Sequence, residues 1–74
     1  MERFDFRHLP SPEPLDCALG VAERLGAGQR ACVLTPCRPA PLLGALDDMG
    51  VTYRVRMLDE GGCEVILEVG RGPD

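Results

Sequence analysis

The sequence is poor in several residue types on which functional classes depend. It has no lysine or tryptophan, one tyrosine and one histidine, and its eight basic residues, all arginine, are outnumbered by twelve acidic ones. The net charge of −4 repels a phosphate backbone, so we expect no nucleic-acid partner. No apolar run approaches a membrane span, and the charged start MERFDFRH lacks the apolar segment of a secretory signal. We therefore expect a cytoplasmic protein with no membrane partner.

The four cysteines lack the spacing of a metal site. A structural zinc site normally has paired ligands such as C-x-x-C, and no such pair occurs here. The closest pair, Cys32 and Cys37, is separated by four residues, and His8 is the only histidine that could join them. Disulfides are equally disfavoured in a reducing compartment. We expect no metal and no cofactor.

The remaining composition is that of a small globular domain. Seventy-four residues, 45% of them hydrophobic and 27% charged, predict a single domain over residues 1–74. Alternation places Phe4 and Phe6 on one face of a strand at 3–7. A helical period over 12–25 puts an apolar stripe on one side: Leu15, Ala18, Leu19, Ala22 and Leu25.

The second half of the chain shows the same two kinds of periodicity, of strands and of a helix. A buried strand is expected over 29–35, followed by a helix over 39–49 that Gly50 ends, with the stripe Leu42, Leu43, Leu46 and Met49. Two alternating strands, 51–58 and 63–69, form a hairpin around a loop at 59–61. Its register places Met57 opposite Cys63 and Arg56 opposite Glu64, with Arg54 diagonal to Glu64 and Glu68.

This order is β-α-β-α-β-β. Right-handed crossovers place both helices on one face of a four-stranded mixed sheet. The expected fold is therefore α/β, as an α+β two-layer sandwich. The other face of the sheet carries alternating charges and should be open to water.

The stretch LPSPEP has a structural interpretation at every position. Ser11 suits the N-cap of the first helix, since its hydroxyl accepts from a first-turn N–H. Pro12 then falls at N1 and Pro14 at N3, where a missing N–H costs little. Glu13 suits the positive end of the helix dipole. A catalytic serine would need a base, and His8, three residues away, has no third partner, so we favour the N-cap. We expect no catalytic residue.

The cysteines differ in their expected settings. Cys32 and Cys63 alternate within strands and should be packed as small apolar residues. Cys17 lies off the core line of its helix and should be partly exposed. Cys37 follows the second strand, so it should share the carboxyl edge of the sheet with Ser11. Arg38 beside it would lower the pKa of the thiol. The candidate binding residues at this edge are His8, Ser11, Glu13, Cys37 and Arg38.

A resemblance to known families rests on LPSPEP and the preceding DFRHL. LPSPEP resembles the Leu-x-Cys-Pro-x-Pro signature of the TusA/SirA-like sulfur carriers, in which the cysteine carries a persulfide. Ser11 stands at that position and cannot hold a persulfide. A closer resemblance, from Pro10 to Gly50, is to the TusA relatives called domain of unknown function 2249, with LPxPEP and a later P-x-P-L. It implies the TusA-like fold and a loose association with redox and nitrogen-oxide metabolism.

Two functions of different classes remain. The first is a non-catalytic binding or adaptor module that contacts a protein or a small anionic ligand. The second is a thiol or sulfur carrier that uses Cys37 or, less favourably, Cys17. We expect a monomer or a weak homodimer, since a domain this small has open sheet edges.

Overall fold

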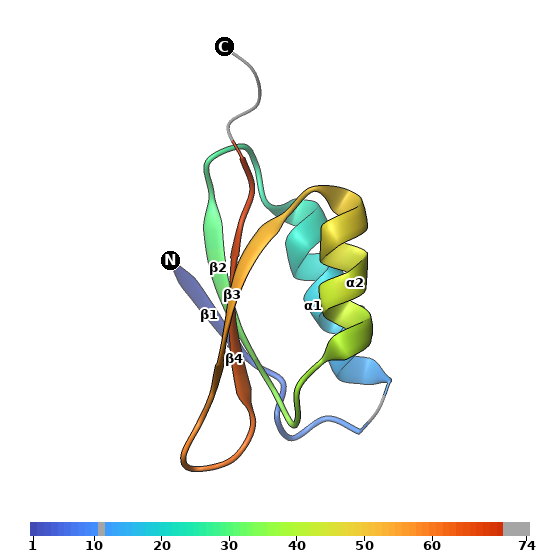
Figure 1. Cartoon of the computed structure of the whole chain (residues 1–74), viewed down its shortest axis with the longest axis vertical. Helices are drawn as coiled ribbons and strands as arrows, with labels where there is room; N and C mark the ends of the chain where they lie inside the picture. The colour runs from blue at the N-terminus through green and yellow to red at the C-terminus, as the bar shows by residue number, and fades with distance from the viewer. Residues whose placement is uncertain (11, 71–74) are drawn as a thin grey trace.

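The computed structural model describes residues 1–10 and 12–70 and contains six elements in the predicted order (Figure 1). They are β1 (Glu2–Asp5), α1 (Glu13–Arg24), β2 (Arg30–Thr35), α2 (Ala40–Met49), β3 (Thr52–Met57) and β4 (Cys63–Glu68). Both helices lie on one side of the four-stranded sheet, and the other side is open. The predicted two-layer fold is confirmed. Within the described residues, no helix has the length and apolar character needed to cross a membrane.

The strands are arranged in the order β1-β2-β4-β3. β1 is parallel to β2, whereas β4 is antiparallel to both of its neighbours. Met57 is opposite Cys63 and Arg56 is opposite Glu64, and the Leu58 N–H donates to the Gly62 carbonyl over 3.0 Å. The predicted hairpin register is therefore correct.

The core lies between the helices and the inner face of the sheet. Its fully buried side chains include Ala18, Leu42, Leu46, Val33, Val65 and Leu67. The sequence did not indicate which face of β2 meets the helices. Val33 is buried in the core, so the face that carries Val33 is the inner one. Cys32 and Leu34 point to the open face and are still only 7% and 1% exposed. Leu34 is shielded because it lies in register between Asp5 of β1 and Glu64 of β4.

Two side chains of the helices are placed differently from the prediction. Val21 is outside the apolar stripe predicted for this helix, yet it is 3% exposed, because β1 extends the sheet beneath its side of the helix and Val21 lies near Phe4 and Ala31. Met49, expected in the apolar stripe of α2, is 42% exposed in the last turn of the helix. Gly50 ends that helix at φ +74°, as predicted.

The start of α1 is also shifted from the prediction. The Asp16 N–H donates to the Pro12 carbonyl over 3.2 Å, so Pro12 is the N-cap and Pro14 is at N2. The predicted positions were N1 for Pro12 and N3 for Pro14, one residue further into the helix. Ser11 lies outside the described residues, and the capping role of its side chain stays a prediction.

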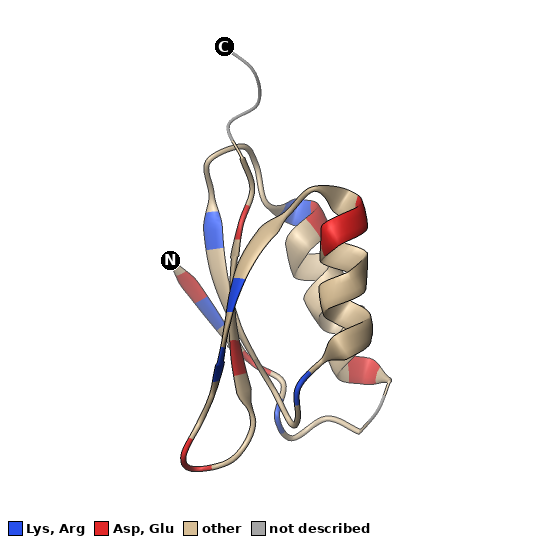
Figure 2. Cartoon of the chain, in the orientation of Figure 1, with Lys and Arg blue, Asp and Glu red and all other residues tan. Residues whose placement is uncertain are grey.

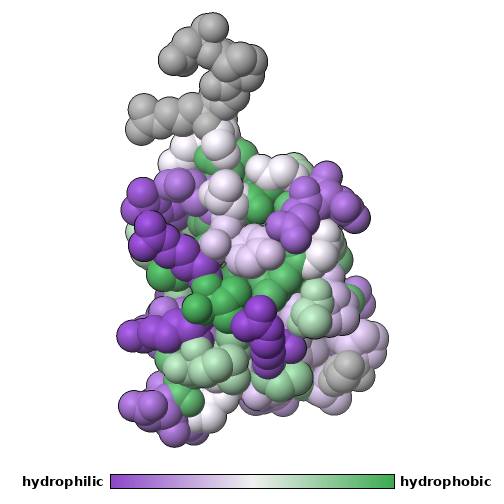
Figure 3. All heavy atoms as spheres, in the orientation of Figure 1, coloured by the Kyte–Doolittle hydropathy of each residue, from purple (hydrophilic) through white to green (hydrophobic). Residues whose placement is uncertain are grey.

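Charges are distributed unevenly between the two layers. Figure 2 shows both signs of charge along the strands, and acidic residues at both ends of the helical layer. On the open face Arg56 pairs with Glu64 over 3.4 Å, as expected from the register, and Arg30 pairs with Glu68. Arg54 lies opposite Ile66 and therefore diagonal to Glu64 and Glu68, as predicted, while the ion pair of Glu68 is with Arg30. Figure 3 shows hydrophilic side chains gathered along the outer side of the sheet, with apolar ones between sheet and helices.

Candidate functional site

The loops that follow β1 and β2 meet at one edge of the sheet, between the N-termini of α1 and α2. They enclose a hollow of about 250 Å³, which we call the edge hollow. Three quarters of its lining is proline or leucine. The lining residues are Leu9, Pro12, Pro14, Leu15, Thr35, Pro36, Cys37, Arg38, Pro39, Pro41 and Leu42. The sequence prediction that these two loops share an edge is thus supported by the arrangement of the elements.

Prolines give the edge hollow its rigidity. Pro12 and Pro39 are the N-caps of α1 and α2, at φ −95° and −90°, and Pro14 and Pro41 follow at N2 of each helix. At all four residues the ring restricts rotation about φ. Proline also removes a backbone N–H, so the helix starts gain apolar surface and lose donors. The hollow is therefore preformed and apolar.

The donors that remain at the two helix starts are mostly occupied. In α1 the Glu13 N–H donates to the Pro10 carbonyl over 2.9 Å, and the Leu15 N–H donates to the Pro12 carbonyl over 3.1 Å. In α2 the Ala40 N–H donates to the Arg38 carbonyl over 3.1 Å. A helix N-terminus attracts anions through free N–H groups. This edge accordingly suits an apolar group better than a small anion.

Thr35, at the end of β2, fixes the loop that carries Cys37. Its side chain is 2% exposed, and its hydroxyl donates to the Cys37 carbonyl over 2.8 Å. The bond holds the first turn of the loop against the strand end. Thr35 is not among the predicted site residues; the available signal was a polar residue at the end of an otherwise apolar strand, directly before a proline.

Gly62 brings the β3–β4 turn against the same edge. Its φ is +90°, and a Cβ there would lie 2.7 Å from the Thr35 carbonyl oxygen and 2.8 Å from Cδ of Arg7. Arg7 in turn pairs with Asp5 over 2.8 Å and with Glu60 over 3.7 Å. Gly61, the last residue of the predicted loop, also has a positive φ, at +104°. The close approach of Gly62 involves strands distant in sequence, so no local signal marks it.

The predicted site residues are only partly brought together. Cys37 and Arg38 are exposed and line the edge hollow. His8 and Glu13 are also exposed at this end of the molecule, but neither is among the residues that line it. Ser11 lies outside the described residues.

The thiols fall into two groups, and all four are free in the part of the chain that the structure describes. Cys32 and Cys63 are buried, and burial raises the pKa of both thiols. Cys17 is half-buried beside Phe4 and Phe6, as its position on the helix predicted. Cys37 is the exposed thiol, so it is the one that a reagent in solution reaches first.

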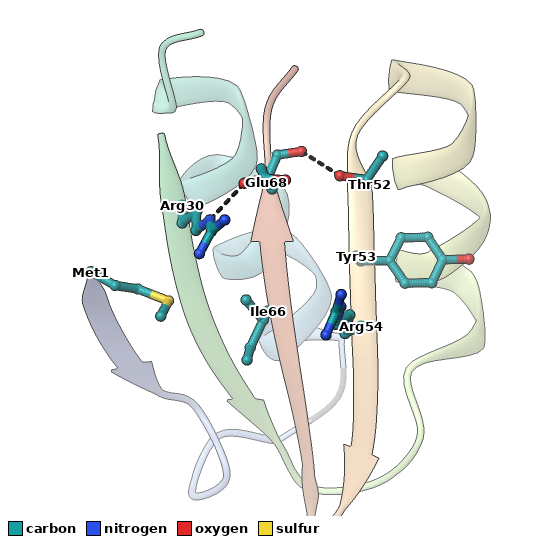
Figure 4. Close-up of a pocket in the computed structure, with 7 residues that line it drawn as sticks. All are labelled: Met1, Arg30, Thr52, Tyr53, Arg54, Ile66 and Glu68. Carbon is teal, nitrogen blue, oxygen red and sulfur yellow. Dashed lines mark hydrogen bonds and ion pairs between the residues drawn. The ribbon is translucent and has the colours of Figure 1, made fainter. Parts of the chain in front are cut away.

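A second hollow, of about 380 Å³, lies on the open face of the sheet (Figure 4), and we call it the open-face hollow. Its side chains are largely polar and interact with one another. Arg30 pairs with Glu68, and the Thr52 hydroxyl donates to the Glu68 carbonyl over 3.0 Å. Ile66 forms the apolar part of its floor, beside Arg54. Most of the polar groups here are thus satisfied within the protein.

Comparison with known proteins gives a match in structure. No family model matches the chain, and no curated protein matches its sequence. A crystal structure of a SirA-like protein from Desulfitobacterium hafniense superimposes with a TM-score of 0.79 at 26% sequence identity. The match covers 95% of this chain and 99% of that one. Over nearly its whole length the chain is therefore similar to a SirA-like protein, which supports a place in the SirA/TusA-like superfamily.

Proposed function

We propose that this protein is a non-catalytic binding or adaptor domain whose edge hollow receives an apolar side chain of a protein partner. The observation that carries the proposal is the proline-lined hollow between the two helix starts. Burying one large apolar side chain contributes roughly 1.5–3 kcal/mol. Because prolines hold the hollow in shape, little of this is lost in ordering the site.

The chemistry of the lining favours binding over catalysis. Among the described residues that line the edge hollow there is no histidine and no carboxylate to act as a base. Of the two partner types left open by the sequence, a protein is better supported than a small anion, because the helix starts present few free N–H groups. Arg38 at the rim is available to a carboxylate of the partner.

The resemblance of LPSPEP and the later P-x-P-L to domain of unknown function 2249 gives the proposal a setting. That family is loosely associated with redox and nitrogen-oxide metabolism. We propose that this protein acts in the same metabolism, in the cytoplasm. The position of Ser11 at the place of the carrier cysteine agrees with a role that needs no persulfide there.

A second candidate function is a thiol or sulfur carrier that uses Cys37, or less favourably Cys17. It is supported by the exposure of Cys37 at the rim of the hollow. In this reaction the Cys37 thiolate attacks the outer sulfur of a persulfide donor, forming a new S–S bond and releasing the donor as its thiolate. Mass spectrometry after exposure to a persulfide donor would then find one added sulfur atom, lost in Cys37→Ser.

The binding proposal is tested by placing a charge in the edge hollow. Leu9 is half-buried and lines the hollow, so Leu9→Glu should weaken capture of the partner by about ten-fold or more. Met57→Glu, on an exposed residue at the end of β3, is the matched control and should bind like the wild type. NMR shifts caused by the purified partner should map around the edge hollow. Shifts confined to the open-face hollow, or equal binding by Leu9→Glu, would show the assignment to be wrong.

A further inference from the structure

The outer edge of β1 carries backbone groups that no strand of the sheet pairs with. β1 is an edge strand and is hydrogen-bonded to β2 alone. The Phe6 N–H, directly after the strand, donates to the Leu34 carbonyl over 2.8 Å. Since successive residues of a strand direct their N–H and C=O groups to opposite sides, Arg3 and Asp5 direct theirs away from β2. This edge can therefore accept another strand.

Apolar surface lies along the same edge on the helix side. Phe4 and Phe6 are only half-buried, and their rings stack with centroids 6.0 Å apart. α1 packs on β2, so both rings lie at the border of the helical layer. One hollow of about 240 Å³ reaches from Glu2 to Phe4, and a shallower one of about 480 Å³ reaches from Phe4 to Phe6. The two hollows lie two residues apart along β1. Successive side chains on one face of an added strand have the same spacing, so each hollow can receive one of them.

The charges on β1 are complementary to those on β1 of a second, antiparallel copy of the chain. Arg3 and Asp5 share the open face on either side of Phe4. In an antiparallel pairing centred on Phe4, Arg3 would face Asp5 of a second copy, and Asp5 would face Arg3 of that copy. Asp5 already pairs with Arg7 of its own chain over 2.8 Å, so Arg3 of the copy would join this ion pair. These are also the residues whose backbone groups point outward, so both pairs would be hydrogen-bonded pairs. Phe4 would face Phe4 in the closer, non-hydrogen-bonded arrangement. A shift of register would set Arg3 against Arg3 or Asp5 against Asp5.

We propose that the β1 edge is a self-association site, where a second copy of this chain adds antiparallel to β1 around Phe4. The two four-stranded sheets would become one continuous sheet, and the half-buried phenylalanines of both copies would cover each other. The contact is isologous, so it closes as a dimer. It leaves the edge hollow free and is independent of the binding function proposed above.

Charge substitutions on β1 test this proposal directly. Wild-type protein should shift with concentration from the mass of one 8.0 kDa chain to that of two, measured by sedimentation equilibrium. Arg3→Asp sets acid against acid, and Asp5→Arg sets arginine against arginine, so each should dimerise about ten-fold or more weakly. Mixed in equal amounts, the two variants restore opposite charges at both pairs and should form a heterodimer.

A control distinguishes β1 from the rest of the open face. Arg54→Asp makes the same change of charge on β3, at the other edge of the sheet, and should dimerise like the wild type. Melting curves establish that each variant is folded; the mixing experiment tests the pairing even if Asp5→Arg is less stable alone, because its partner variant then stabilises it. A wild type that stays monomeric at millimolar concentration, an Arg3→Asp variant that dimerises normally, or an equal loss in Arg54→Asp would each overturn the proposal.

Discussion

The edge hollow and the open-face hollow are concave surfaces of comparable size, about 250 and 380 Å³, built from opposite chemistry. In the open-face hollow Glu68 is engaged twice, by the Arg30 guanidinium and by the Thr52 hydroxyl. Polar groups that already bond to one another within the protein gain little further free energy from binding a ligand. The edge hollow is lined by five prolines and three leucines, and its apolar surface stays in contact with solvent until something covers it.

The two hollows also differ in how the chain builds them. The open-face hollow follows largely from period-two alternation in neighbouring strands, because register sets Arg30 and Thr52 beside Glu68, and Arg54 beside Ile66. The edge hollow depends on two loops held by a few specific contacts, among them the local hydrogen bond from Thr35 to Cys37 and the packing of Gly62 on Thr35. Substitutions should therefore disturb the edge hollow much more than the open-face hollow.

The largest expected effect is at Gly62. A Cβ at this residue meets a backbone oxygen, that of Thr35, and the left-handed φ adds strain. We expect Gly62→Ala to lower the free energy of unfolding by roughly 3 kcal/mol, and the melting temperature by about 10–20 °C. Gly61→Ala is the matched control: its φ is also positive, at +104°, but no atom lies within 4 Å, so about 1 kcal/mol is expected. Equal losses in the two variants would show that the contact with Thr35 is unimportant.

A smaller loss of stability is expected from substituting threonine, of which each hollow contains one. Thr35 and Thr52 each donate a hydroxyl hydrogen bond to a backbone carbonyl, but only Thr35 is buried. Thr35→Val should cost about 1–2 kcal/mol and loosen the Cys37 loop, seen as faster alkylation of that thiol. Thr52→Val should change stability by at most about 0.5 kcal/mol. Denaturant unfolding of the pair measures the difference, and a larger cost for Thr52→Val would reverse the comparison.

The smallest effect concerns the charges at the end of β1. Hydrogen bonds from the Arg7 side chain and backbone lower the pKa of Asp5 from 3.8 to about 2. Because the folded pKa is the lower one, ionised Asp5 contributes stability at pH above 3.8, and this contribution is lost as the pH falls toward about 2. The melting temperature should therefore decline more steeply over this range in the wild type than in Asp5→Asn. Parallel curves for the two proteins would contradict the expectation. The effect is small since Asp5 is exposed and screened.

The order of elements and the hairpin register could be predicted from the sequence because they rest on local periodicity and turn chemistry. Val21 and Met49 could not, because their burial depends on where each helix lies across the sheet. β1 extends beneath the Val21 side of α1, whereas Met49 is exposed at the last residue of α2. Within the site, the position of the two loops at one edge of the sheet could be predicted from the order of the elements. Gly62 could not be predicted because its contacts are with Thr35 and Arg7, which are distant in sequence, whereas the hydrogen bond of Thr35 is local and its polar side chain at the end of an apolar strand was an available signal.

The place of β4 in the sheet bears on how this chain is synthesised. β4 is the last strand in the sequence, yet it lies between β2 and β3 and supplies Cys63, Val65 and Leu67 to the core. When β3 leaves the ribosome its only neighbour in the sheet has not been made, so β3 has nothing to pair with. The core cannot close until β4 has been synthesised. Folding should therefore be a late, single event after translation of residue 68, instead of a gradual one from the N-terminus.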